Sequence, residues 1–116
     1  MALTVGTKWY VKEGDFGGYL TEQLLDENRE PVDLSLATVA FTMRRSTDGE
    51  AYVDGGAAEV VGDPLDGIVR YQWTDGDTAE PGEFRFEWRV TFSTDQIQTF
   101  PSNGYNTVEV LRHLNG

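Results

Sequence analysis

Histidine and cysteine provide most catalytic bases, nucleophiles and soft metal ligands in proteins, and this chain has almost none of either. Its only histidine is His113, close to the C-terminus, and it contains no cysteine. A Ser-His-Asp arrangement requires a histidine that accepts a proton, and the common zinc and iron sites require several His or Cys ligands. We therefore interpret His113 as a solvated terminal group and predict no disulfide, zinc site or iron site.

Carboxylates are the other groups that could hold a metal ion. Asp75 and Asp77 flank a glycine in a predicted loop, where oxygen ligands suit a hard cation such as calcium. Their spacing matches no twelve-residue calcium-binding loop, and neither does that of Asp63 and Asp66 in another predicted loop. An acidic chain also places carboxylates in loops by chance. Asp75 and Asp77 are thus weak calcium candidates, and we expect no cofactor.

The sequence shows no catalytic residues, so we expect a protein that is not an enzyme. Its glycines are scattered and form neither of the phosphate-binding patterns GxxxxGK[ST] and GxGxxG. A glycosidase-like pair of carboxylates would need a substrate cleft, and a sandwich of 116 residues has no obvious loops to build one.

Several aromatic residues do not follow the regular alternation of the predicted strands. Aromatic rings with a polar end are favoured at protein interfaces, which makes these residues interface candidates. The alternative, which the sequence leaves open, is that they cover the open edges and ends of the core. The candidates are Trp9, Tyr10, Phe16, Tyr19 and Tyr105.

The chain is strongly acidic, with 20 Asp and Glu against 9 Lys and Arg and a net charge of -11. Nucleic-acid binding depends on clustered Lys and Arg that neutralise phosphates, so we expect no nucleic-acid partner. No apolar run approaches the roughly 18 residues of a membrane-spanning helix, and the start MALTVGTKWY lacks the basic and apolar regions of a signal peptide. We therefore expect no membrane partner either.

Lysine is scarce among the cations, because only Lys8 and Lys12 are lysines and the rest are arginines. Scarce lysine with carboxylates spread along the chain indicates a halophilic source, since salt screens the repulsion between them. The alternative is an ordinary acidic surface. If the source is halophilic, we expect the melting temperature to rise as salt is raised from low to molar concentration. A melting temperature that does not respond to salt would contradict this expectation.

Three segments alternate large apolar residues with polar ones, which predicts half-buried strands. They are EFRFEWRVTF (residues 83–92), TVAFTMRR (Thr38–Arg45) and IVRYQW (residues 68–73). The residues expected to point inward are Val39, Phe41, Met43, Val69, Tyr71, Trp73, Phe84, Phe86, Trp88, Val90 and Phe92.

Weaker strand signals lie between turn-forming segments rich in Gly, Pro, Asp and Asn. They cover residues Thr7–Lys12, Tyr19–Leu25, Ala51–Val53, Ala57–Val61, Gln96–Phe100 and Asn106–Leu111. The segment TEQLLDENRE could form at most a turn or two of helix. Short strands at this spacing are typical of a sandwich or small barrel, and no linker divides the chain. We predict a single all-β domain over residues 1–116.

Three longer segments carry a resemblance to a known family: VDLSLATVAFTMRR, GIVRYQWTDGDTAEPGEFRFEWRVTF and QTFPSNGYNTVEV. They resemble the immunoglobulin-like N-terminal domain of tailed-phage baseplate upper proteins and related small virion proteins of tailed viruses, over about residues 32–110. The resemblance implies an immunoglobulin-like antiparallel β-sandwich without catalytic or cofactor residues. Within it, Asp77 and Thr78 are expected to form a corner pinned by side chain to backbone hydrogen bonds.

The function that this resemblance implies is that of a structural virion protein in a tail, baseplate, neck or capsid-associated assembly. Its partners would be other virion subunits or copies of itself. Family baseplate proteins are often longer, with a C-terminal region that binds neighbours or receptor, so a small connector, decoration or tail subunit suits this chain better. The alternative function is an adhesive module that binds a receptor or glycan through exposed Trp and Tyr.

Overall fold

The computed structural model describes residues 8–101, 106–112 and 114, which contain eight strands, one short 3-10 helix and no α-helix. The elements in order are β1 (Lys8–Lys12), β2 (Tyr19–Gln23), β3 (Thr38–Arg45), β4 (Ala51–Val60), η1 (Pro64–Asp66), β5 (Ile68–Gln72), β6 (Gly82–Thr91), β7 (Ile97–Phe100) and β8 (Asn106–Leu111). The predicted all-β class is confirmed. No helix in these ranges is long and apolar enough to cross a membrane.

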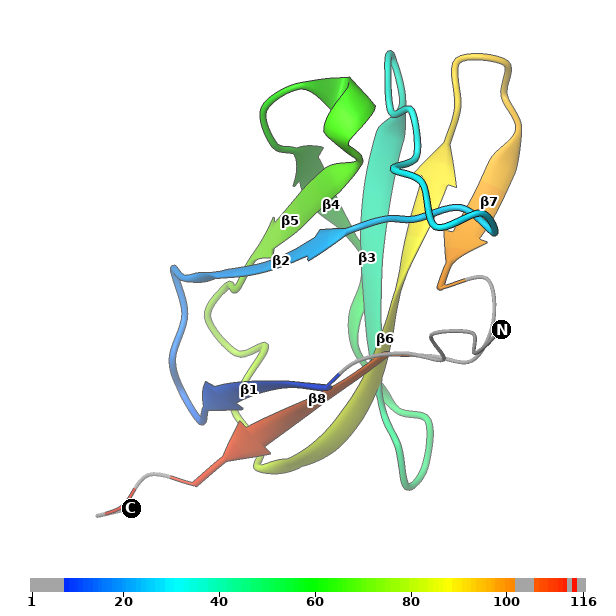
Figure 1. Cartoon of the computed structure of the whole chain (residues 1–116). Helices are drawn as coiled ribbons and strands as arrows, with labels where there is room; N and C mark the ends of the chain where they lie inside the picture. Colours follow the sequence, from blue (N-terminus) through cyan, green and yellow to red (C-terminus); the bar gives the residue numbers. More distant parts are fainter. Residues whose placement is uncertain (1–7, 102–105, 113, 115–116) are drawn as a thin grey trace.

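Two sheets face each other and share one long strand (Figure 1). The large sheet has the order β1-β8-β6-β3-β4, and β7 pairs with the second half of β6. The second sheet has the order β4-β5-β2, so β4 belongs to both. Gly55 in β4 has a φ of 69°, and the register between β4 and β3 shifts beside it. A glycine in this conformation is typical of a β-bulge, which bends the strand from one sheet toward the other.

The inward stripes predicted from the sequence form the core between the sheets. Phe41, Phe84 and Trp88 have no exposed surface. The Phe41 ring stacks on Tyr71 of the second sheet at 4.3 Å between centroids and lies 5.0 Å from Trp88. Such aromatic pairs add about 0.5 to 1.5 kcal/mol each beyond the burial of their area. Among the residues predicted to point inward, only Phe92, beyond the end of β6, is half-buried.

The structure corrects three details. The predicted strands Ala51–Val53 and Ala57–Val61 are one strand, because the glycines between them form a bulge and not a turn. β1 pairs with β8 in parallel, whereas the other described strand pairs are antiparallel. The segment after β2 contains no helical turn, since Asp26 Oδ1 closes a tight turn by accepting hydrogen bonds from the backbone N–H groups of Asn28 and Glu30.

Candidate docking site

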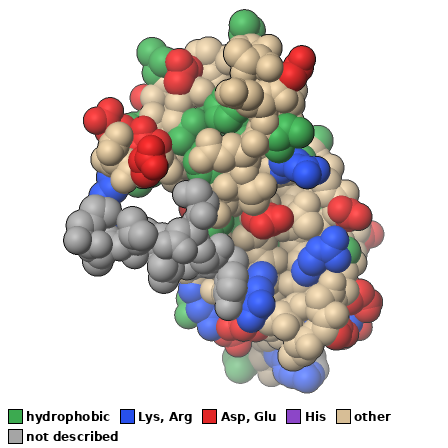
Figure 2. All heavy atoms as spheres, turned by 90° about the vertical axis from the view of Figure 1, so that its right-hand side faces the viewer, with side chains coloured by type: hydrophobic (Ala, Val, Ile, Leu, Met, Phe, Trp, Pro, Cys, Tyr) green, Lys and Arg blue, Asp and Glu red, His purple; other side chains and the backbone are tan. Residues whose placement is uncertain are grey.

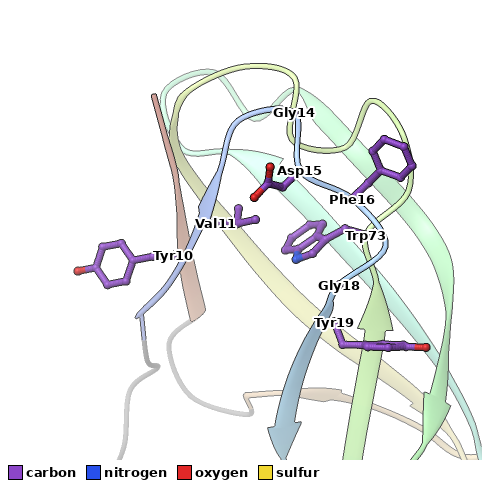
Figure 3. Close-up of a pocket in the computed structure, with 8 residues that line it drawn as sticks. All are labelled: Tyr10, Val11, Gly14, Asp15, Phe16, Gly18, Tyr19 and Trp73. Atoms are coloured by element: carbon purple, nitrogen blue, oxygen red, sulfur yellow. The ribbon is translucent and has the colours of Figure 1, made fainter. Parts of the chain in front are cut away.

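One side of the sandwich carries a hollow between the edges of the two sheets (Figure 3). Its volume is about 460 Å³, and it is bordered by β1, the β1–β2 connection, the start of β2 and the residue after β5. The lining residues are Tyr10, Val11, Gly14, Asp15, Phe16, Gly18, Tyr19 and Trp73. Phe16 is 60% exposed and Tyr19 is 46% exposed, so two large rings stay in contact with water at this site.

Hydrogen bonds to a distant turn fix the β1–β2 connection, residues 13–18. The backbone N–H of Gly14 donates to the carbonyl of Thr78 at 2.9 Å, and the hydroxyl of Thr78 donates to the carbonyl of Asp15 at 2.7 Å. A loop without such bonds would lose conformational entropy when a partner bound it. The contacts therefore preorganise Phe16 for binding.

The turn that presents Thr78 is organised by a buried carboxylate, Asp77. Its Oδ2 accepts hydrogen bonds from the Tyr71 hydroxyl at 2.7 Å, the Thr74 backbone N–H at 2.8 Å and the Thr74 hydroxyl at 3.0 Å. Burial, together with the hydrogen bond to Asp77, raises the pKa of Tyr71 to about 12, so the phenol remains a donor at neutral pH. The corner expected at Asp77 and Thr78 is therefore observed, and it supports the hollow from below its surface.

The two calcium candidates lie in this same turn. Asp77 is 8% exposed and uses Oδ2 in the bonds to Tyr71 and Thr74, whereas Asp75 is exposed. Within residues 8–101, 106–112 and 114, no three His, Cys, Asp or Glu side chains are grouped as metal ligands. Calcium binding by Asp75 and Asp77 stays a prediction, and His113 lies outside the described residues.

The five interface candidates occupy different places. Tyr10, Phe16 and Tyr19 all line the hollow, and in Figure 3 their rings point outward from it, Tyr10 to one side and Phe16 and Tyr19 to the other. Trp9 is half-buried and packs edge-on against the core ring of Phe86 at 5.2 Å, so it covers the core as the alternative interpretation expected. Tyr105 lies outside the described residues.

A row of side chains on the outer face of the second sheet holds Tyr19. The Arg70 guanidinium lies 4.0 Å from the centroid of the Tyr19 ring, and Arg70 Nε donates to Glu59 Oε1 at 2.5 Å. A cation over an exposed aromatic ring contributes about 0.5 to 1 kcal/mol. The three residues come from β2, β5 and β4, so the position of the ring depends on the whole second sheet.

Sequence analysis missed a carboxylate that joins the two sheets, Glu22 of β2. Its Oε1 accepts hydrogen bonds from Trp88 Nε1 and Asn106 Nδ2, each at 2.7 Å, and both donors belong to the large sheet. Burial raises the pKa of Glu22, and the two hydrogen bonds oppose part of that increase. The signal in the sequence was its position between Leu20 and Leu24, which places Glu22 on the inward face of β2.

These features define a two-sheet β-sandwich with a preorganised aromatic hollow on one side. A solved structure with a similar fold is CopC from Methylosinus trichosporium OB3b, with a TM-score of 0.53 and 16% sequence identity. The similarity covers 94% of this chain and 88% of that chain. At this identity the similarity shows the fold alone.

A second solved structure, a family 123 glycoside hydrolase from Clostridium perfringens, aligns with 12% identity and a TM-score of 0.39. The alignment covers 98% of this chain but only 24% of that chain, and a score this low supports no argument about function. No protein-family model matches the chain, and no curated protein matches it.

Proposed function

We propose that this protein is a non-enzymatic structural subunit of a tailed virus particle, which docks against other virion subunits or copies of itself. The observation that carries the proposal is the exposure of Phe16 and Tyr19 on a site fixed by internal hydrogen bonds. Aromatic residues are enriched in protein interfaces, and a preorganised site loses less entropy on binding. The virus assignment rests on the resemblance of residues 32–110 to tailed-phage virion proteins.

Open strand edges give the proposal further support. Among the described strands, β2 pairs only with β5, and β7 pairs only with β6. A strand paired on one side offers unpaired backbone groups to another chain. Ile97 at the start of β7 is 57% exposed and would add an apolar contact beside that edge. Docking of this kind requires no cofactor and no nucleic-acid or membrane partner.

The test is to purify virus particles that carry this gene and to map the neighbours of the chain by cross-linking and mass spectrometry. We expect the chain in the particles, with cross-links from the side that carries the hollow. Replacing Phe16 with serine is expected to reduce incorporation by about tenfold, as loss of an aromatic interface anchor does. Leu65→Ser is the matched control, because Leu65 is 59% exposed on η1 and Phe16 is 60% exposed. A strictly monomeric chain that is absent from purified particles would overturn the proposal.

A second candidate function, glycan or receptor binding, is favoured by the hollow itself. Its volume of about 460 Å³ falls within the range of small-molecule sites, and the Asp15 side chain points into it beside Trp73 (Figure 3). A glycan array with the purified chain separates the two functions. Binding to a defined sugar that is lost in Phe16→Ser and Asp15→Asn would favour the adhesive function over structural docking.

A further inference from the structure

The outer face of the large sheet carries a large share of the positive charge. On β1, β8, β6 and β3, the outward side chains include five of the 9 Lys and Arg residues but only three of the 20 Asp and Glu residues. The cations are Lys8, Lys12, Arg44, Arg85 and Arg89, and the carboxylates are Glu83, Glu87 and Glu109. The rest of the chain therefore combines four cations with 17 carboxylates. These four strands therefore present five outward cations against three carboxylates, whereas the outward side of β4, the last strand of this sheet, carries the exposed carboxylates of Asp54 and Glu59. The positive charge is confined to the part of the face formed by β1, β8, β6 and β3.

The pairing register places the arginines close together. One row across four strands consists of Lys8, Thr107, Arg85 and Arg44. Neighbouring strands are about 4.8 Å apart, and like charges directly opposite each other, as in Arg44 and Arg85, are destabilising. Lys8 pairs with Glu109 at 3.0 Å, whereas Arg44 and Arg89 make no ion pair with any described residue. An acidic partner would form charge-assisted hydrogen bonds with Arg44 and Arg89.

The rest of this face suits a flat protein contact. The outward residues around the arginines are small, namely Thr38, Ala40, Thr42, Thr91, Thr99 and Thr107. Two exposed apolar side chains lie at opposite ends of the same face, Tyr10 at 62% and Ile97 at 57% exposure. Interfaces are enriched in tyrosine and arginine, and small side chains lose little entropy when they are covered.

The opposite side of the molecule carries a compact acidic turn, residues 26–33. Its exposed carboxylates are Asp26, Glu27, Glu30 and Asp33, with Arg29 as the cation among them. Hydrogen bonds from two backbone N–H groups to Asp26 Oδ1 make the turn rigid. Figure 1 shows this connection crossing in front of β3 and β6, on the inner side of the large sheet. In Figure 2, acidic side chains gather at the upper left, and the basic side chains on the right lie among further acidic ones.

We infer that the outer face of the large sheet binds the acidic turn, residues 26–33, of a second copy of this chain. Arg44 and Arg89 would meet the exposed carboxylates of this turn, and hydrogen bonds within the turn hold it before binding. The two surfaces lie on opposite sides of one molecule, so the contact is head-to-tail and produces rings or filaments. This inference rests on the proposed function, because it names the partner and the two surfaces that meet.

The ionic strength decides whether this contact forms in solution. Two copies with a net charge of -11 repel each other at long range. The Debye length is about 30 Å at 0.01 M salt and about 10 Å at 0.1 M, so the higher concentration screens this repulsion across the molecule. Pairs in direct contact are screened much less. We therefore expect self-association to strengthen between these two concentrations.

The test uses two charge-reversed versions of the whole chain. The face variant carries Arg44→Glu and Arg89→Glu, and the loop variant carries Glu27→Lys and Glu30→Lys. At about 0.1 M salt, sedimentation is expected to show oligomers of the wild type and about tenfold or greater weakening of association in each variant alone. An equal mixture of the two variants is expected to associate again, because the acidic turn of one fits the unchanged face of the other and the reversed surfaces also match.

The loop variant separates local complementarity from net charge. Its charge is four units less negative than -11, so weaker repulsion alone would increase its association. A monomeric wild type at all salt concentrations would overturn the inference, and so would oligomers that survive both reversals. If particles incorporate the wild type but exclude the face variant, while the purified chain stays monomeric, the partner is a different acidic subunit. The proposed function would then stand and this inference would fall.

Discussion

Replacing Trp88 with alanine is expected to lower the free energy of unfolding by about 3 to 5 kcal/mol, as truncation of large core aromatics does. Trp88 has no exposed surface, and its ring lies 5.0 Å from Phe41 and 6.1 Å from Phe86. The change leaves a cavity between the sheets and removes the donor to Glu22. Single domains are stable by about 5 to 15 kcal/mol, so this change removes a large part of the total. Urea unfolding followed by circular dichroism measures it.

Two further substitutions test this interpretation, one at Trp88 itself and one at an exposed aromatic residue. Trp88→Phe keeps most of the ring volume but removes the indole N–H, so its cost is expected to be smaller than that of alanine. Phe16→Ala removes an aromatic ring that is 60% exposed and is expected to change stability by less than about 0.5 kcal/mol. If Trp88→Ala were as mild as Phe16→Ala, residue 88 would not lie between the sheets.

The strands that sequence analysis located best are those whose alternation is uninterrupted. The predicted bounds Thr38–Arg45 and Asn106–Leu111 agree with β3 and β8, because in each strand buried residues alternate with residues that keep some contact with solvent. β4 was divided wrongly at its glycines. A glycine pair has the same local signature in a turn and in a bulge, and only the partner strands on both sides decide between them.

Long-range pairing is the part of the fold that alternation does not specify. β1 and β8 are nearly 100 residues apart in the sequence, and their parallel register, with Trp9 opposite Val108, depends on the path of the whole chain between them. An alternating stripe predicts which face of a strand is buried, but it is the same for a parallel and an antiparallel neighbour. For this reason the sandwich was predictable, while this pair was not.

The candidate site was predictable in part. Phe16 and Tyr19 were interface candidates because they fall outside the alternating inward stripes, and both line the hollow. The same criterion also selected Trp9, which packs on Phe86. Trp9 lies in the short edge strand β1, and the sequence pattern of such a strand does not show whether its ring turns toward the core or toward solvent. The contact by which Thr78 fixes the β1–β2 connection joins residues 63 positions apart in the sequence, which spacing does not reveal.

The two substitutions of Glu22 are expected to have opposite effects at neutral pH. Glu22→Ala leaves the buried donors of Trp88 and Asn106 without this acceptor, and we expect a loss of about 2 to 4 kcal/mol in the free energy of unfolding. Glu22→Gln keeps an acceptor oxygen but cannot ionise. Because burial raises the pKa of Glu22, the charged form is disfavoured in the folded state, and the glutamine variant is expected to be at least as stable as the wild type.

The pH dependence of this comparison follows from the direction of the pKa shift. The folded-state pKa of Glu22 lies above its unfolded value of about 4.3, so its contribution to stability is fully present below that pH and is lost as pH rises through the folded pKa. The glutamine variant has no such loss. Its stability relative to the wild type is therefore expected to increase as pH rises above about 4.3 and then to level off. The free energies of unfolding of the two proteins are measured by urea unfolding at each pH, and the contributions of the other carboxylates cancel in their difference. If this difference stays constant or decreases as pH rises, burial does not disfavour the charged form of Glu22.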